Sequence, residues 1–133
     1  MSVVSTEQMQ VKAESDVVTA RRRVREISTQ LGFSLVDQTK VVTAASELAR
    51  NTIIHGGGGT MTVESLNGPR LGLRLVFEDS GPGISDIEMA LRDGFTTGSG
   101  LGLGLGGAKR LVNEFEIDSR VGQGTRITIT RWK

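Results

Sequence analysis

The chain has 133 residues, a formal net charge of +1 and no cysteine, with 37% hydrophobic and 23% charged residues. This length allows one domain with its own core, and the composition excludes a disordered chain, a disulfide framework, a thiolate metal site and a catalytic thiol. The balanced charge, without a membrane-length apolar stretch or a basic leader, gives no case for nucleic acid or a membrane as partner. We therefore expect one cytoplasmic domain over residues 1–133.

The first half of the chain predicts one strand and then two amphipathic helices. Residues 8–13 alternate loosely between polar and apolar types, as in a short strand. A helix of about fifteen residues should follow, with Asp16 as its N-cap and Gly32 as its stop. Ser34 should begin a second helix, with Asp37 as its capping-box partner, which continues to a run of four glycines.

The second half has mostly strand periodicity. Residues 60–64 and 71–77 flank Asn67-Gly68-Pro69, a pattern typical of a hairpin. The remaining elements are expected at 85–92 (one or two helical turns), about 105–114 (a helix), and 116–120 and 126–132 (two strands joined at Gly122-Gln123-Gly124). This order, β-α-α-β-β-loop-α-β-β, predicts an α+β two-layer sandwich: a mixed, mostly antiparallel sheet with helices on one face.

Glycine is the unusual residue, at 18 of 133 positions, about 14% against a typical ~7%. Ten of the glycines lie within 56–59 and 98–107, and each costs about 0.5–1 kcal/mol relative to alanine in ordered structure. The second cluster precedes a predicted helix, whose free N–H groups favour an anion such as phosphate. Gly102, Gly104 and Gly107 match G-x-G-x-x-G, but the preceding strand of a dinucleotide site and the lysine of a P-loop are missing. A surface loop without a ligand is the alternative.

Three further patterns are weak when taken singly. Glu47 and Asn51 are four residues apart on one helix face, where they could supply a base and a Mg²⁺ ligand, although this spacing usually marks a solvated face. The stretch from Asp79 to Gly83 directly follows an apolar strand, and Gly122-Gln123-Gly124-Thr125 directly precedes the last one. Each of these two is also typical of an ordinary turn.

Taken in order, the four patterns resemble the N, G1, G2 and GT boxes of the GHKL (Bergerat-fold) ATP-binding family of gyrase, Hsp90, histidine kinases and MutL. The resemblance covers about residues 7–132. Within the family the chain is most similar to the RsbT-type switch kinases of bacterial partner-switching (stressosome) systems. The stretches that carry this similarity are Ser46–Asn51, Glu78–Ile84, Asp93–Thr97 and Lys109–Phe115.

The resemblance implies a serine/threonine kinase that uses ATP and Mg²⁺ to phosphorylate a STAS-domain antagonist. Once released, the kinase would act on a downstream regulator such as a phosphatase. The alternative is an anti-sigma factor that sequesters a sigma factor and phosphorylates its anti-anti-sigma factor. Related anti-sigma kinases often carry an arginine just before the G2 glycines, where this chain has Gly100 and Leu101, and this departure favours the switch kinase.

The resemblance also implies residue roles. Asp79 would accept a hydrogen bond from the adenine amino group, and Thr125 would add a contact near the base. Asn51 would bind Mg²⁺, and Glu47 would be the general base for the substrate hydroxyl. The residues expected to bind ATP are Asn51, Asp79, Gly81, Gly83, Ile84, Thr96, Thr97, Gly100, Leu101, Gly102, Leu103, Gly104 and Thr125.

Some positions receive no single role from the sequence. Arg50 has three open alternatives: a partner, a phosphate or solvent. His55 is expected at the helix end, with contact to the nucleotide as the alternative, and Lys109 on a solvated helix face, with steering of the phosphate as the alternative. The basic cluster Arg21–Arg25 would suit an acidic protein partner, and a homodimer is possible because related anti-sigma kinases dimerise through their sheets.

Overall fold

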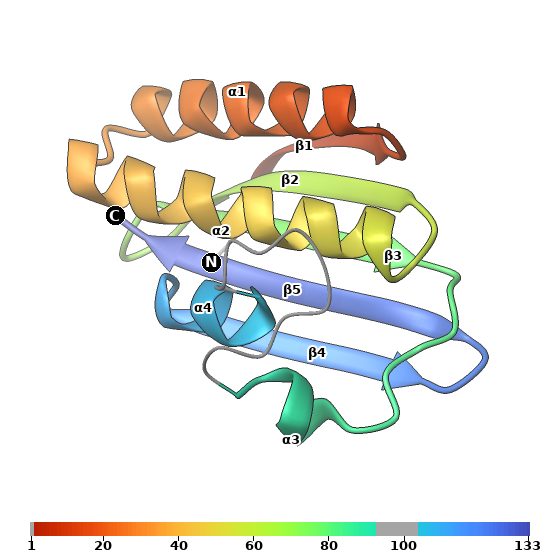
Figure 1. The fold of residues 1–133 in the computed structure, drawn as a ribbon. Helices are drawn as coiled ribbons and strands as arrows, with labels where there is room; N and C mark the ends of the chain where they lie inside the picture. Colours follow the sequence, from red (N-terminus) through yellow and green to blue (C-terminus); the bar gives the residue numbers. More distant parts are fainter. Residues whose placement is uncertain (1, 93–103) are drawn as a thin grey trace.

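The computed structural model describes residues 2–92 and 104–133, which form a sheet layer and a helix layer (Figure 1). The elements are β1 (Ser2–Val11), α1 (Glu14–Gln30), α2 (Leu35–Ile54), β2 (Gly59–Asn67), β3 (Gly72–Asp79), α3 (Ile87–Ala90), α4 (Gly104–Arg110), β4 (Glu114–Arg120) and β5 (Gly124–Trp132). This order confirms the predicted α+β succession, with α3 supplying the expected helical turn. Within these residues, no helix combines the length and apolarity needed to cross a membrane.

The sheet has the strand order β1-β2-β3-β5-β4, and every neighbouring pair is antiparallel. The prediction of a mixed sheet is therefore wrong in this respect. The reason lies in α1 and α2, which run out and back as a helical hairpin. They return the chain to the end of the sheet that it left, so that Gly59 at the start of β2 pairs with Val11 at the end of β1.

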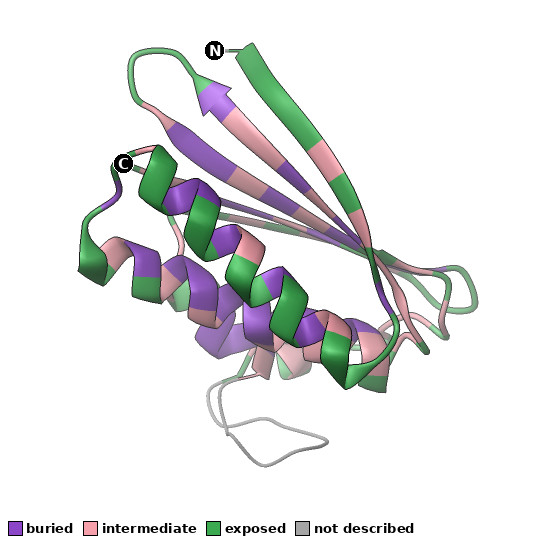
Figure 2. Cartoon of the chain, turned by 90° about the horizontal axis from the view of Figure 1, so that it is seen from above, coloured by how far each residue is buried: buried purple, intermediate pink, exposed green. Residues whose placement is uncertain are grey.

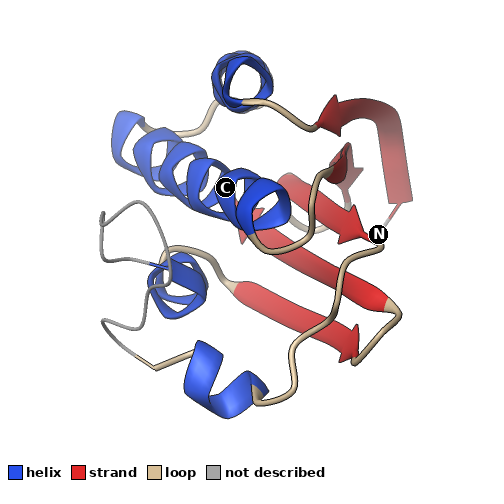
Figure 3. Cartoon of the chain, turned by 45° about the vertical axis from the view of Figure 1, so that its right-hand side comes forward, coloured by secondary structure: helices blue, strands red, loops and turns tan. Residues whose placement is uncertain are grey.

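The core lies between the sheet and the helices, which cover one face only (Figure 2). Strand β3 shows the expected alternation: Leu73, Leu75 and Phe77 are buried beneath the helices, and the residues between them point to the other face. Each such side chain stabilises the fold by about 1.5–3 kcal/mol through burial. Helix α2 lies between α1 and α4 in the row of helices beside the sheet (Figure 3).

Three predicted boundaries need correction. Strand β1 begins at Ser2 and ends at Val11, so it starts earlier than predicted. Asp16 is not the N-cap of α1: Ala13 holds that position, and Asp16 Oδ2 accepts hydrogen bonds from the N–H groups of Lys12 (2.9 Å) and Ala13 (3.1 Å) from within the first turn. Helix α4 ends at Arg110 rather than near residue 114, because Glu114 already begins strand β4.

The predicted N-cap of α2 is confirmed, and the same turn carries an ion pair. Ser34 Oγ accepts a hydrogen bond from the Asp37 N–H at 3.1 Å. The Asp37 carboxylate instead turns to the last strand, where its Oδ1 lies 2.6 Å from Arg131 Nη2. This hydrogen bond with Arg131 is the main reason that the pKa of Asp37 is lowered.

We predict that Asp37→Asn lowers the free energy of unfolding by about 1–2 kcal/mol at neutral pH, because it removes a charged hydrogen bond between mostly buried partners. A lowered pKa stabilises the folded state above the ordinary carboxyl pKa, and this contribution disappears as the pH falls through the lowered value. The difference between variant and wild type in urea unfolding should therefore shrink in acid.

Asp118→Asn is the matched control, because its partner Arg126 is 3.9 Å away and both side chains are mostly exposed. This control should change stability by less than about 0.5 kcal/mol. An equal loss for Asp37→Asn at neutral and acid pH would contradict the assigned role of the ion pair.

Candidate functional site

Two of the predicted motifs meet where α2 and β3 end. Gly56 follows the last turn of α2, and a Cβ atom there would lie only 2.5 Å from Asp79 Oδ2. Gly81 approaches from the turn after β3, where a Cβ atom would lie 2.7 Å from the Gly56 Cα. The Asp79 carboxylate is held in this turn, because its Oδ1 accepts a hydrogen bond from the Gly81 N–H at 2.9 Å. Asp79 therefore lies against the backbone of Gly56 and Gly81 at the end of the sheet.

The sheet register brings the last predicted motif to the same place. Asp79 pairs with Thr125 on β5 and with Gly59 on β2, so β3 ends where β2 and β5 begin. Thr125 is buried and continues the helix-facing row of β5 residues that includes Ile127. A Cβ atom at Gly124 would overlap the Asp79 carbonyl oxygen, which shows how closely the two backbones approach.

Ser119 is a site residue that the sequence analysis missed. Its hydroxyl accepts a hydrogen bond from the Ile84 N–H at 2.8 Å and lies 2.7 Å from Thr125 Oγ1. It thereby joins the segment after Asp79 to the strand that carries Thr125. The available signal was the β4–β5 hairpin, in which Ser119 and Thr125 are paired across the predicted glycine turn.

Glu47 and Asn51 lie on α2, before the end of the helix that contacts Asp79. Along the helix axis they are roughly 12 and 6 Å from the C-cap residue His55, at about 1.5 Å per residue. The Glu47 side chain is 12% exposed, and Arg50 Nη1 lies 3.8 Å from its Oε1. Asn51 is half-buried. The two side chains therefore share a helix face that is partly shielded from water, one and two turns from the glycine-lined end.

The expected phosphate-binding stretch is only partly described. Gly104 begins α4, which packs against α2. A Cβ atom at Gly106 would overlap the Leu91 carbonyl oxygen, so α4 also lies close to the end of α3. Of the residues expected to bind ATP, Thr96, Thr97, Gly100, Leu101, Gly102 and Leu103 lie outside the described residues.

The described side chains alone do not form a metal site, so a bound metal ion would need further oxygen ligands from the nucleotide or from water. Among the side chains that the structure describes, no group of three or more histidine, aspartate or glutamate residues could hold a metal ion. Mg²⁺ commonly takes one or two protein oxygens and completes its octahedron with phosphate and water oxygens. The amide oxygen of Asn51 fits this donor set.

Residues 36–133 match the family model for histidine kinase-, DNA gyrase B- and HSP90-like ATPases. Over 125 residues the chain is 43% identical to the serine/threonine-protein kinase RsbT of Bacillus subtilis (strain 168), covering 93% of this chain and 94% of that protein. It is 31% identical over 120 residues to the anti-sigma F factor of Thermoanaerobacter sp. (strain X514), covering 85% and 82% of the two chains.

The fold also matches solved structures. The structure of the RsbU and RsbW domains of a Mycobacterium tuberculosis protein superposes with a TM-score of 0.65 at 23% identity, covering 97% of this chain and 32% of that one. The catalytic domain of the histidine kinase ThkA superposes with a TM-score of 0.56 at 18% identity, covering 96% of both chains. At these identities the two structures show a shared fold.

We predict that Gly124→Ala destabilises the protein more than Gly122→Ala, although the backbone angle φ is positive at both positions, at +102° and +80°. A Cβ atom at Gly122 meets nothing within 4 Å, so this variant should lose only about 1 kcal/mol from backbone strain. At Gly124 the Cβ atom overlaps the Asp79 carbonyl oxygen, and the loss should exceed about 3 kcal/mol. Urea unfolding measures both, and equal losses would contradict the close approach of β5 to Asp79.

Proposed function

Because the chain belongs to the histidine kinase-, DNA gyrase B- and HSP90-like ATPase family, we propose that it transfers the γ-phosphate of ATP to a STAS-domain antagonist protein. It is an ATP-dependent protein serine/threonine kinase, in keeping with 43% identity to such a kinase over nearly the whole of both chains. The observation that carries the proposal is the convergence of Gly56, Gly81 and Thr125 on Asp79, at the end of the helix that also carries Glu47. Residues 1–133 would act as one kinase domain.

Asp79 would recognise adenine. Its Oδ1 already accepts the Gly81 N–H, so Oδ2 is the oxygen that would accept the exocyclic amino group of the base. The glycine backbones packed around the carboxylate fix its position, and Thr125 would add a hydrogen bond beside the base. Ile84, half-buried after the same turn, would cover an apolar part of the ring.

The phosphates would extend from this end toward Asn51. Asn51 would hold Mg²⁺, and the ion would supply positive charge that stabilises the phosphates. Gly104 at the start of α4, with Thr96, Thr97 and the residues 100–103, would bind the phosphates through backbone and hydroxyl groups.

Glu47 would act as the general base. Its carboxylate would accept the proton of the substrate hydroxyl as the hydroxyl oxygen bonds to the γ-phosphorus and the bond from phosphorus to the β–γ bridging oxygen breaks, releasing ADP. Phosphoryl transfer depends mostly on positioning and charge stabilisation, and a shielded carboxylate on a buried helix is well placed for this.

We predict that Asp79→Asn weakens ATP binding at least about 100-fold, because an amide can place an N–H donor against the adenine amino group and leave both unsatisfied. Calorimetric titration with ATP and Mg²⁺ measures the change, and circular dichroism checks the fold. Asp118→Asn, the same change on exposed β4, should bind ATP normally. Normal titration of ATP by Asp79→Asn would contradict its adenine role.

The kinase itself is tested by transfer of label from γ-labelled ATP to a purified STAS-domain protein. We predict that Glu47→Gln binds ATP like the wild type and transfers label about 10²- to 10⁴-fold more slowly, because it cannot accept a proton. Unchanged transfer would refute Glu47 as the base. An ATP-bound wild type that labels no STAS protein would refute the proposed substrate.

Phosphorylation would act as a switch. A phosphate adds nearly two negative charges to the STAS surface and would release the complex by repulsion and desolvation. The freed kinase, in the cytoplasm, would then act on a downstream regulator such as a phosphatase within a stressosome-like system. We also propose that the protein can form a homodimer. The basic cluster Arg21–Arg25 would contact an acidic surface on a partner protein.

The second candidate is an anti-sigma factor that holds a sigma factor and phosphorylates its anti-anti-sigma factor. The observation that favours it is 31% identity to an anti-sigma F factor over most of both chains. A stable complex between the purified protein and a sigma factor would distinguish it from a switch kinase.

A further inference from the structure

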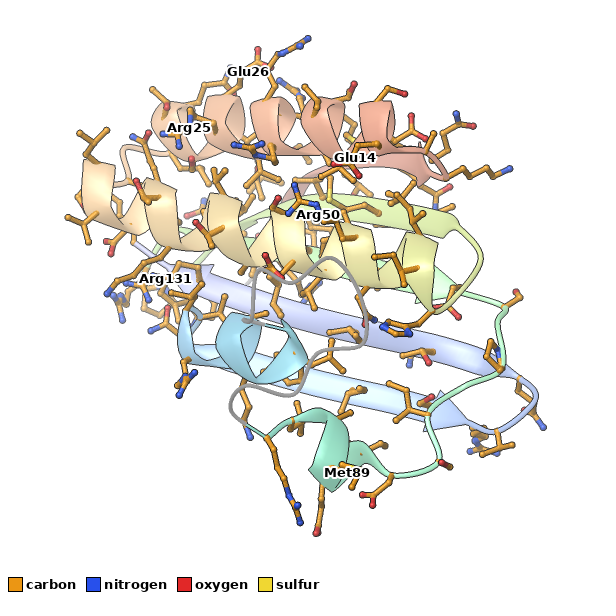
Figure 4. All side chains as sticks on the ribbon, viewed as in Figure 1. Glu14, Arg25, Glu26, Arg50, Met89 and Arg131 are labelled. Atoms are coloured by element: carbon orange, nitrogen blue, oxygen red, sulfur yellow. The ribbon has the colours of Figure 1, made fainter. Side chains whose placement is uncertain are left out.

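Arg50 lies between two carboxylates from different helices. Its Nη1 is 3.8 Å from Oε1 of Glu47, one turn earlier on α2, and its Nε is 3.5 Å from Oε1 of Glu14. Glu14 belongs to the first turn of α1. Figure 4 shows Arg50 on the side of α2 that faces α1, where Glu14 lies.

The side chains of Glu47, Arg50 and Glu14 differ in their exposure to solvent, and this difference indicates what each contact can do. The Glu47 and Arg50 side chains are only 12% and 21% exposed, whereas that of Glu14 is 70% exposed. The contact of Arg50 with Glu47 is the longer of the two, but it lies where water is partly excluded, which strengthens an ion pair. Glu14 contacts the same guanidinium from the solvent side and steadies it.

Arg50 does not point where Asn51 points. At 3.6 residues per turn, neighbouring residues differ by about 100° around the helix axis, so Arg50 faces α1 while Asn51 faces the side where Mg²⁺ is proposed to bind. The sequence left three alternatives for Arg50, namely a partner, a phosphate or solvent, and the structure does not support them equally. The contacts favour an action of Arg50 on Glu47 over direct binding of the nucleotide.

We propose that Arg50 is a positioning residue that holds the Glu47 carboxylate in the orientation in which it accepts the proton of the substrate hydroxyl. Glu14 anchors Arg50 from α1 and so connects that helix to the base. This inference rests on the proposed role of Glu47. A glutamate side chain has three rotatable bonds, and a displacement of about 1 Å can cost 100-fold in rate, so the base needs such a restraint.

The test compares phosphoryl transfer by Arg50→Gln, Arg50→Lys and Glu14→Gln with that of the wild type. Arg50→Gln should lower kcat about 10- to 100-fold while the affinity for ATP changes less than about two-fold. Arg50→Lys keeps a positive charge and should recover part of this loss. Glu14→Gln should lower kcat about two- to five-fold, because its side of the ion pair is exposed.

Two controls match these changes. Arg126→Gln removes an arginine from an ion pair of similar length on the sheet, at 3.9 Å. Glu26→Gln makes the same change as Glu14→Gln on the same helix, at an exposed residue (Figure 4). Both should keep the wild-type kcat. Thermal unfolding of every variant separates a loss of rate from a loss of fold.

The double variant Glu47→Gln/Arg50→Gln distinguishes positioning from an independent effect. If Arg50 acts through Glu47, the double variant transfers phosphate no more slowly than Glu47→Gln alone. Losses that multiply would overturn the proposal, and so would an Arg50→Gln variant that loses ATP binding or keeps the wild-type kcat. If the wild type itself transfers no phosphate, the proposed function fails and this inference fails with it. An active wild type with a normal Arg50→Gln variant refutes the inference alone.

Discussion

The contact between the end of α2 and the end of β3 determines the rest of the arrangement. Because Gly56 has no side chain, the backbone after α2 reaches both the Asp79 carboxylate and the Gly81 backbone. This contact sets the position of α2 along the central strand β3. It therefore also sets how far Glu47 and Asn51 lie from Asp79. A side chain at Gly56 would separate the helix from the strand and change the two distances together.

Helix α2 holds these residues in place because one of its faces is buried from Gln38 to Thr52. Its core-facing residues include Val41, Ala44 and Leu48, none of which is exposed, and Thr52 returns its hydroxyl hydrogen bond to the Leu48 carbonyl. Side chains on such a helix move little, which suits a reaction that depends on alignment. The α1–α2 hairpin also places α1 beside Glu47, so that a charge on the first turn of α1 contacts Arg50. Packing and chemistry thus depend on the same helix.

Local patterns allowed much of the fold to be predicted. The Ser34 cap, the β2–β3 hairpin and the β4–β5 turn depend on residues close in sequence, and all three appear where expected. Asp16 was misplaced because a carboxylate is typical both of the N-cap and of the first helical turn, from which it here accepts the N–H groups of Lys12 and Ala13. The strand directions and the contact between Arg50 and Glu14 depend on which elements lie side by side. Residue types and spacing do not contain that information.

The two ends of the site depend on different kinds of contact, so substitutions at each end have different effects. At the Asp79 end, backbone meets backbone, and a Cβ atom at Gly56, Gly81 or Gly124 would overlap a neighbouring atom. At the Glu47 end, side chains meet side chains: Arg50 lies 3.8 Å from Glu47 on the same helix and 3.5 Å from Glu14 on α1. Substitutions at the first end therefore disturb the fold and the base-binding geometry together. Substitutions at the second can change rate or partner while the nucleotide end stays intact, because the helix backbone that joins the two ends is held by its own buried contacts.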